Sequence, residues 1–223
     1  MQHFIHSIGI VSSPYTQKFG IPRQPQLVPA AKICITLNPE FSMDCVRGLD
    51  GFDYIWVQFL FHDAISEGWS EMVRPPRLGG KKKIGVFATR SPHRPNHIGL
   101  SLLQLEYVDN LNGRVQIWCN GGDLLDGTPV LDIKPYIPFV EAKPDAQAGF
   151  VSGAPKQLAI EWQPESGVTN LSTEIRNLIE QSLAQDPRPA YQNIPERVYG
   201  MEIAGLDIKF RIVDNTVLVL SCK

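Results

Sequence analysis

The sequence predicts a mainly β fold with a small α+β appendage, and three observations lead to this class. Short runs of β-branched and aromatic residues alternate with turn residues through the first half of the chain. One amphipathic helix pattern and one hairpin pattern follow late in the chain. Strands do not alternate with long helices, and neither a GxGxxG nor a Walker sequence occurs. The fold is therefore expected to be non-Rossmann.

The first half contains three clear strand patterns. They are ICITL at 33–37, YIWVQFLF at 54–61 and RVQIW at 114–118. Turn-forming residues occur between these runs, at 37–40, 47–51 and 109–113. Short strands joined by turns are typical of a barrel or a sandwich.

The appendage is predicted from a helix and a hairpin. Apolar residues of 171–184 recur on one helical face, with Asn170 as the expected N-cap and Asp186-Pro187 as the stop signal, so this helix should pack on a sheet. Alternating apolar residues on both sides of Asp214-Asn215 predict a hairpin. The stretch 142–155 is rich in Ala, Pro, Gly and Ser and is expected to be a linker. These patterns predict a main domain of residues 1–150 and an appendage of residues 151–223.

Composition restricts the class of protein. Of the 223 residues, 43% are hydrophobic and 20% are charged, as in an ordinary folded protein rather than a disordered one. No apolar run approaches the roughly 20 residues of a membrane helix, and the first residues do not read as a signal peptide, so a cytoplasmic protein without a membrane partner is expected. The four cysteines are scattered without a CxxC pair, so no metal site or disulfide framework is expected.

Charge is distributed unevenly along the chain. The net charge is −2, yet the stretch from Glu71 to Gly99 contains seven basic residues and one acidic residue, a local net charge of +6. A basic stripe on an otherwise acidic body is an electrostatic footprint for a polyanion. A solvated surface loop is the alternative interpretation.

A stiff polar loop lies within this basic stretch. The sequence from Ala88 to Asn96 follows a short apolar run and contains Arg90, Arg94 and two prolines, which fix the backbone and hold its polar groups in place. Arginine forks match carboxylate or phosphate oxygens bidentately. The residues alone leave both a ligand-binding loop and a structural loop open.

Three aspartates form a second cluster, Asp123, Asp126 and Asp132. Their carboxylates are suited to holding a metal, gripping ribose hydroxyls or acting as a base, although their spacing does not fit an EF-hand. A turn at Asp126-Gly127 is the alternative. A third polar cluster between prolines spans VSSPY at 11–15 and IPRQP at 21–25.

These clusters, together with RGL at 47–49, RPPRLGG at 74–80 and QDPRPAY at 185–191, resemble the TsaA/TrmO family of tRNA methyltransferases. The resemblance covers nearly the whole chain, and GVFATRSPHRPNHIG at 85–99 is its most specific part. It implies transfer of a methyl group from S-adenosyl-L-methionine to N6 of N6-threonylcarbamoyladenosine, immediately 3′ of the tRNA anticodon. It also implies a single-sheet β-barrel and a cofactor pocket near a homodimer interface.

The resemblance also implies which residues contact the cofactor, with Arg90 as the most important one. Matched by motif, they are Pro22, Arg23, Gln24, His62, Asp63, Arg90, Leu102, Leu125, Asp126, Gly127 and Thr128. His93 and His97 depart from the family pattern, and we interpret both as tolerated substitutions rather than catalysts.

Catalysis and RNA binding are assigned more broadly. The acylated N6 is a poor nucleophile until its proton leaves, so a base is expected, with Asp126, Asp132 and Tyr191 as candidates. The expected RNA contacts are Arg74, Arg77, Lys81, Lys82, Lys83, Arg94, Arg188 and Tyr191. A non-enzymatic RNA-binding module, a methyltransferase on another substrate and a small-molecule hydrolase remain the alternatives.

Overall fold

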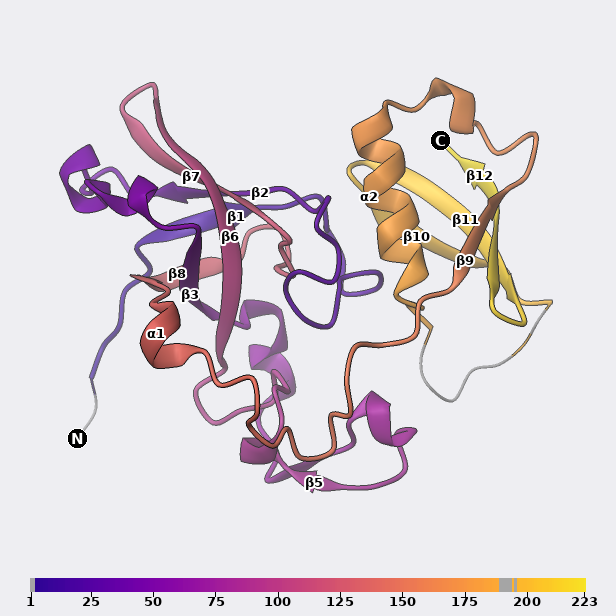
Figure 1. The fold of residues 1–223 in the computed structure, drawn as a ribbon, viewed down its shortest axis with the longest axis horizontal. Coiled ribbons are helices and arrows are strands. Elements are labelled where there is room, and N and C mark those ends of the chain that lie inside the picture. Colours follow the sequence, from indigo (N-terminus) through magenta and orange to yellow (C-terminus); the bar gives the residue numbers. More distant parts are fainter. Residues whose placement is uncertain (1–2, 189–193, 195) are drawn as a thin grey trace.

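Two large β-sheets lie side by side in the computed structural model, which describes residues 3–188, 194 and 196–223, and a third sheet has two short strands (Figure 1). The larger sheet has the strand order β1-β2-β7-β6-β3-β8, and β8 pairs with β1, so that the sheet closes into a barrel. Its strands are β1 (Gly9–Ser12), β2 (Ile33–Leu37), β3 (Tyr54–Leu60), β6 (Ile98–Leu111), β7 (Arg114–Asn120) and β8 (Pro129–Pro135).

Alternation of side chains builds the barrel core. In β3, Ile55, Val57 and Phe59 are buried while their neighbours are partly exposed, and β7 follows the same pattern. Successive side chains of a strand point to opposite faces, so one apolar set fills the interior. The mainly β, non-Rossmann prediction is confirmed, and β2 occupies the predicted residues 33–37.

A long excursion connects β3 to β6 across residues 61–97. It contains short elements only: η3 (His62–Glu67), β4 (Met72–Val73), η4 (Pro76–Leu78), β5 (Ile84–Gly85) and η5 (Val86–Ala88). The remaining short helices of the barrel half are η1 (Met43–Val46), η2 (Leu49–Gly51) and α1 (Pro138–Glu141). Both the basic stripe and the polar loop of the sequence lie on this excursion.

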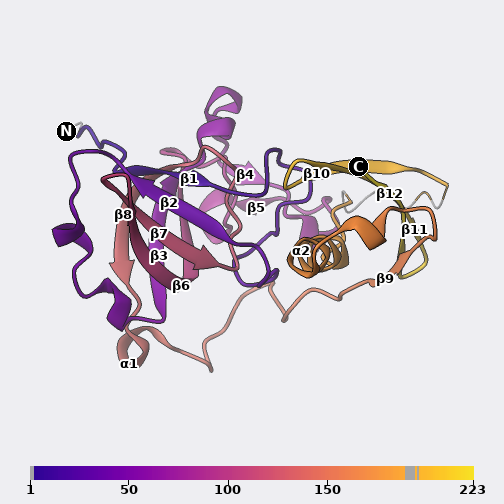
Figure 2. The same ribbon diagram turned by 90° about the horizontal axis from the view of Figure 1, so that it is seen from above.

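The C-terminal part is a four-stranded sheet with helix α2 on one face (Figure 2). Its elements are β9 (Ala159–Trp162), η6 (Val168–Asn170), α2 (Thr173–Ala184), β10 (Tyr199–Ile203), β11 (Leu206–Val213) and β12 (Thr216–Cys222). The predicted hairpin and the packing of the helix on the sheet are confirmed. The expected N-cap was wrong: Ser172 caps α2, because its side chain accepts a hydrogen bond from the backbone N–H of Ile175 at 3.3 Å, whereas Asn170 belongs to η6.

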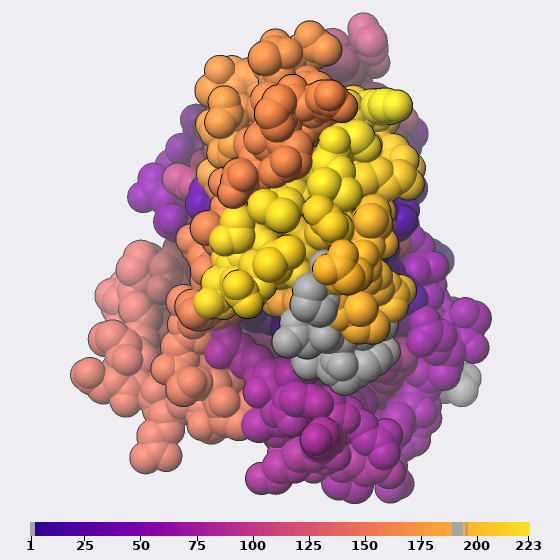
Figure 3. Space-filling view, turned by 90° about the vertical axis from the view of Figure 1, so that its right-hand side faces the viewer, coloured from indigo at the N-terminus to yellow at the C-terminus, as the bar shows by residue number. Residues whose placement is uncertain are grey.

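Residues 14–31 cross from the barrel half to the C-terminal sheet. Tyr15, Val28 and Ala31 are buried in the same apolar cluster as α2 and strands β10 to β12. The Tyr15 and Ser182 hydroxyls form a buried hydrogen bond at 3.0 Å. Figure 3 shows the face where the C-terminal strands lie above the β3–β6 excursion. The predicted domain boundary after residue 150 stays a prediction.

Three further features concern membrane-spanning helices, metal-binding clusters and the cysteines. None of the helices formed by residues 3–188 and 196–223 is long and apolar enough to cross a membrane. Within the same residues, no three His, Cys, Asp or Glu side chains are grouped so that they could hold a metal ion. The four cysteines are free thiols, three of them buried, and only Cys45 is exposed.

Candidate functional site

A cavity of about 500 Å³ opens where the end of β3, the start of β6 and three loops meet. This volume is typical of a site for a small organic ligand. Its lining residues are Lys18, Ile21, Pro22, Arg23, Gln24, Phe59, Leu60, Phe61, His62, Asp63, Ala64, Thr89, Arg90, Pro92, Arg94, Ile98, Gly99, Leu100, Ser101, Asp123, Leu124, Leu125 and Thr128. Apolar rings and aliphatic chains from the barrel therefore face polar groups from the loops.

Strand pairing forms the apolar wall. Phe59 pairs with Gly99, and Leu60 pairs with Ile98, at the point where β3 leaves the barrel. A Cβ atom on Gly99 would lie 2.2 Å from Cζ of Phe59, so only glycine lets the ring lie this close to β6. The glycine that ends the GVFATRSPHRPNHIG motif thus shapes the cavity.

Arg94 stabilises the polar loop by bonding to backbone carbonyls of the loop itself. Its Nη1 donates to the carbonyl of Thr89 at 2.8 Å and to that of Val86 at 3.3 Å. The Thr89 hydroxyl also donates to Val86 O, at 2.8 Å. These bonds satisfy backbone carbonyls that the loop leaves without a ladder partner, so Arg94 has a structural function at the cavity wall.

Arg90 presents its guanidinium to the cavity. Its Nη1 donates to Oε1 of Gln24 at 2.5 Å, and no carboxylate of residues 3–188 or 196–223 lies within ion-pair distance of it. Gln24 and its neighbours Pro22 and Arg23 come from the polar cluster at 21–25 and line the same cavity. Two motifs 66 residues apart are therefore joined by one hydrogen bond.

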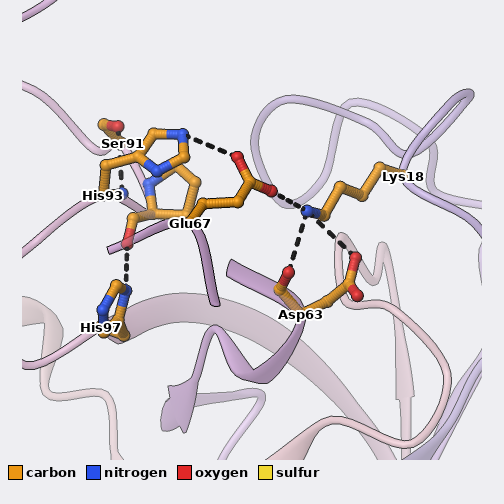
Figure 4. Close-up of polar contacts among 7 residues, drawn as sticks. Lys18, Asp63, Glu67, Ser91, His93 and His97 are labelled. Carbon is orange, nitrogen blue, oxygen red and sulfur yellow. Dashed lines mark hydrogen bonds and ion pairs between the residues drawn. The ribbon is translucent and has the colours of Figure 1, made fainter. Parts of the chain in front are cut away.

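Lys18 links the loop before this cluster to η3 (Figure 4). Its Nζ lies 3.1 Å from Oδ2 of Asp63 and 2.7 Å from Oε1 of Glu67, and the hydrogen bond with Glu67 raises the pKa of Lys18. Nε2 of His93 lies 3.8 Å from the other oxygen of Glu67. Asp63, which borders the cavity, therefore shares the charge of Lys18 with Glu67.

His93 and His97 do not line the cavity. Nδ1 of His97 lies 3.0 Å from the carbonyl oxygen of Pro92, and the backbone of His97 has a φ of 50° (Figure 4). The His97 ring therefore bonds within the loop, whereas the His93 ring lies near Glu67 of η3.

Asp123 is a cavity residue that the motif-based assignment left out. Its Oδ1 accepts a hydrogen bond from Oγ of Ser101 at 2.7 Å. Burial raises the pKa of Asp123 to about 6, although the Ser101 hydrogen bond and the nearby charge of Arg90 lower it. The sequence places Asp123 in the cluster of three aspartates, but only the folded chain distinguishes their surroundings.

Of the predicted cofactor contacts, three lie outside the lining. Leu102 points from the same face of β6 as Leu100 but sits two residues further along, so Leu100 lines the cavity in its place. Asp126 is turned away, because its Oδ1 accepts from the backbone N–H of Ser13 at 2.8 Å, and Gly127 bonds through its own N–H to Val11 O. The remaining predicted contacts border the cavity: Pro22, Arg23, Gln24, His62, Asp63, Arg90, Leu125 and Thr128.

The catalytic candidates do not meet at the cavity. Asp132 lies on β8 and forms an ion pair with Lys134, while Asp126 bonds to Ser13. Tyr191 lies outside the described residues. The structure therefore gives no support to Asp126 or Asp132 as the base, because neither borders the cavity.

The predicted RNA contacts fall into three groups. Arg74, Arg77 and Lys81 to Lys83 are exposed on the excursion between β4 and β5. Arg94 is partly buried in the cavity wall. Nε of Arg188 lies 2.8 Å from Oδ1 of Asp186, and its backbone carbonyl accepts a hydrogen bond from Arg23.

A second, smaller cavity of about 160 Å³ adjoins the first one. It lies between Lys18 to Arg23 and the C-terminal end of α2, where Gln185, Asp186 and Pro187 line it. Lys18, Ile21 and Arg23 line both cavities and form a shared wall.

Family models and curated relatives that match this chain all belong to one family. The family model described as tRNA-methyltransferase O N-terminal domain matches residues 10–142, and the one described as TrmO C-terminal domain matches residues 155–223. A tRNA (adenine(37)-N6)-methyltransferase of Eikenella corrodens is 56% identical over 168 residues, which cover 75% of this chain and 95% of the relative. The protein of the same description from Escherichia coli (strain K12) is 43% identical over 216 residues, 93% of this chain and 92% of the relative.

Solved structures agree with these sequence matches. The crystal structure of TrmO from Pseudomonas aeruginosa superposes with a TM-score of 0.82 at 37% identity, covering 100% of this chain and 99% of that one. The match therefore spans both the barrel and the C-terminal sheet. The chain belongs to the tRNA-methyltransferase O (TrmO) family.

Proposed function

We propose that this protein transfers a methyl group from S-adenosyl-L-methionine to N6 of adenosine 37 in tRNA, with N6-threonylcarbamoyladenosine as the base that it methylates. The observation that carries the proposal is the cavity of about 500 Å³, because it is bordered by residues of the polar clusters at 21–25 and 88–96 on which the family resemblance rests. The relatives named above carry the same activity in their descriptions. The threonylcarbamoyl group is the finer part of the proposal, and it rests on the resemblance and on the charges of the cavity.

The cavity suits the proposed cofactor in size and in chemistry. Phe59, Phe61 and Leu100 offer apolar surface for a nucleoside, and Arg90 offers a fork without a carboxylate partner among the described residues. The cofactor supplies a methyl group activated by a positively charged sulfur. Arg90 would bind its carboxylate, with Gln24 fixing the guanidinium. The other proposed contacts are Pro22, Arg23, His62, Asp63, Leu100, Leu125 and Thr128.

An excess of cations supports an anionic substrate group. Four basic side chains line the cavity, Lys18, Arg23, Arg90 and Arg94, against the two carboxylates of Asp63 and Asp123. A threonylcarbamoyl group carries a free carboxylate, whereas an unmodified adenine does not. Arg23 is a suitable partner because it lies on the wall shared by both cavities.

The exposed basic residues between β4 and β5 are proposed to contact the tRNA backbone. Lys81, Lys82 and Lys83 make no ion pair within residues 3–188 and 196–223, so their charges are available to phosphates. The C-terminal sheet is proposed to extend this contact surface toward Arg188. An anticodon loop suits such a local surface, because its unstacked bases can be splayed into a pocket.

The family resemblance implies two further properties. We propose a homodimer whose interface lies close to the cavity, where Ile65, Trp69, Met72 and Phe87 are exposed large apolar side chains of the excursion. We also propose a cytoplasmic location, where tRNA is modified. Light scattering on the purified protein would detect a dimer by its mass.

Mass spectrometry of tRNA nucleosides tests the activity. The protein is incubated with isotopically labelled S-adenosyl-L-methionine and two preparations of one tRNA, one with the threonylcarbamoyl group and one without it. A labelled methyl group on the modified base alone supports the full proposal. Methylation of unmodified adenosine 37 alone would reject the substrate, and no methylation of either tRNA would leave a non-enzymatic RNA-binding protein as the better description.

A further inference from the structure

We propose that Asp123 is the general base that takes the proton from the N6 nitrogen of the substrate. This inference rests on the proposed function, since it concerns the same cavity and the same reaction. The sequence places Asp123 in a cluster with Asp126 and Asp132 but does not include it among the chosen base or cofactor residues, and the family descriptions name no residue.

Asp123 is held firmly in position. It follows β7 after the pair Gly121-Gly122, whose backbone is tied to the segment 26–31: Gln26 N–H donates to Gly121 O, and Gly122 N–H donates to Ala31 O, both at 2.9 Å. A Cβ atom on Gly122 would lie 2.5 Å from Cγ2 of Ile33, so a side chain there would displace the turn. A fixed turn keeps the carboxyl group at the cavity wall, as a catalytic base requires.

Asp123 differs from the other cavity carboxylate in its partners. Asp63 is in an ion pair with Lys18, 3.1 Å away. Asp123 has no ion pair within residues 3–188 and 196–223, and the Ser101 hydroxyl is the one described side chain that donates to it. Ser101 bonds to Oδ1 and a backbone N–H also stabilises the carboxylate, so we assign the proton from the ligand to Oδ2.

The surroundings of Asp123 suit a base at neutral pH. Desolvation raises the pKa of its carboxyl to about 6, while Ser101 and Arg90 stabilise the ionised form. At pH 7 to 8 most of the carboxyl is therefore ionised, yet it binds a proton more strongly than an exposed aspartate. A base with a pKa near the working pH is the most effective one.

The chemistry of the substrate needs such a group. The N6 electron pair of a threonylcarbamoyl base is delocalised into the adjacent carbonyl and is weakly nucleophilic. In the proposed step the N6–H bond breaks and its proton passes to Asp123 Oδ2, while the N6 electron pair forms the new bond to the methyl carbon. The electron pair of the methyl–sulfur bond leaves with the sulfur, which becomes neutral. Asp123 then returns the proton to solvent.

The pH dependence of single-turnover methylation tests this role. For the wild-type protein and modified tRNA, the rate should rise with pH through about 6 and level off above. Asp123→Asn should lower the rate at pH 7.5 by about 10²- to 10³-fold and abolish this rise. Asp132→Asn is the matched control, because that carboxylate is paired with Lys134 away from the cavity, and it should keep the wild-type rate and profile.

Two measurements that do not depend on activity separate a base from a binding or folding residue. Calorimetry with S-adenosyl-L-methionine alone should give Asp123→Asn the wild-type Kd within about threefold. Carboxyl ¹³C NMR of the labelled protein should give Asp123 a titration midpoint near 6, and Ser101→Ala should raise it, because the hydrogen bond that favours the ionised form is lost. Thermal melting checks that both variants fold.

The results distinguish a base at Asp123 from a cofactor contact there and from a failure of the proposed function. If the wild-type protein is active and Asp123→Asn keeps its rate and its rise with pH, the base lies elsewhere. A much weaker Kd for Asp123→Asn would make Asp123 a cofactor contact, and a midpoint near 4 would remove the argument from its surroundings. If the wild-type protein methylates no tRNA, the proposed function fails and this inference fails with it.

Discussion

Arg23 donates a hydrogen bond from Nη2 to the backbone carbonyl of Arg188 at 3.3 Å. This contact joins the wall of the large cavity to the segment that follows α2, two regions 165 residues apart in the chain. Arg23 also lines the smaller cavity between them. The C-terminal part therefore contacts the site directly rather than through a flexible tether.

Removing the Arg90 guanidinium should weaken cofactor binding. A charge-assisted hydrogen bond contributes about 1.5–3 kcal/mol, so Arg90→Ala should raise the Kd for S-adenosyl-L-methionine by roughly 10- to 100-fold in calorimetry. Arg47→Ala is the matched control, because Arg47 is exposed and pairs with Asp44. Equal Kd values for both variants would show that Arg90 does not hold the ligand.

Reversing charge on the excursion should weaken tRNA binding in a salt-dependent way. Lys81→Glu with Lys82→Glu should lower the affinity by about tenfold or more at ~50 mM salt, and the difference should shrink as salt rises. Filter binding across a salt series measures it. Lys143→Glu with Lys156→Glu makes the same charge change at two other exposed positions, and an equal loss there would mean that net charge alone matters.

The buried contact between Tyr15 and Ser182 should stabilise both parts of the molecule. Tyr15→Phe should lower the free energy of unfolding by about 1–2 kcal/mol, because the Ser182 hydroxyl would stay buried without its partner. Urea denaturation measures this loss. Tyr107→Phe is the control, since its half-exposed ring stacks on Trp118, and it should change stability by less than about 0.5 kcal/mol. A double-mutant cycle with Ser182→Ala that gives no coupling would contradict the contact.

A methyl group at Gly99 should displace the Phe59 ring. Gly99→Ala should destabilise the protein by about 1–3 kcal/mol and weaken cofactor binding, because the new Cβ would lie 2.2 Å from the ring. Thermal melting and calorimetry report the two effects. Gly85→Ala, at the start of the same motif, meets nothing within 4 Å and should be tolerated. Similar behaviour of the two variants would mean that the wall is not packed this closely.

The Asp123 carboxyl should reduce stability at neutral pH. Burial raises its pKa from 3.8 to about 6 in the folded protein, so the unfolded chain releases this proton at lower pH than the folded one. Stability is therefore lost as pH rises from about 4 to 6, and the loss is constant above. Asp123→Asn should be more stable than wild type at pH 7.5, by at most roughly 3 kcal/mol, and the gain should shrink toward pH 4.5 in urea unfolding.

Asp132→Asn is the matched control for this effect, because Asp132 is partly exposed and pairs with Lys134. Its stability should differ little from wild type at either pH. A gain for Asp123→Asn that does not depend on pH would show that its pKa is ordinary.

Local patterns predicted the elements that depend on neighbouring residues. Strand β2 and the β11–β12 hairpin carry a period-two pattern and a turn signal within a few residues. The pairing of β1 with β8 joins residues about 120 positions apart, and the local sequence of neither strand indicates it. The cap of α2 was misplaced by two residues, since Asn170 and Ser172 are both good N-cap residues and only the backbone geometry selects one.

In the candidate site, too, local motifs were recognisable from the sequence, whereas features that depend on distant residues were not. Arg90 and Pro22 to Gln24, which the family resemblance implies as cofactor contacts, border the cavity. Asp123 was grouped with Asp126 and Asp132 but not chosen over them, because its burial and its hydrogen bond with Ser101, 22 residues earlier on β6, arise only in the folded chain. The resemblance implies Leu102, whereas Leu100 lines the cavity. Both lie on one face of β6, and only the end of the barrel decides which one reaches the cavity.

Tyr15, Val28 and Ala31 leave the ribosome early, whereas the helix and strands that bury them come last, up to Cys222. At about 5–20 residues per second, roughly 10 to 40 seconds of synthesis separate the two. During that time this apolar stretch of the nascent chain has no native surface to cover it. Chaperone binding to the growing chain is therefore expected to concentrate on residues 14–31 until translation ends.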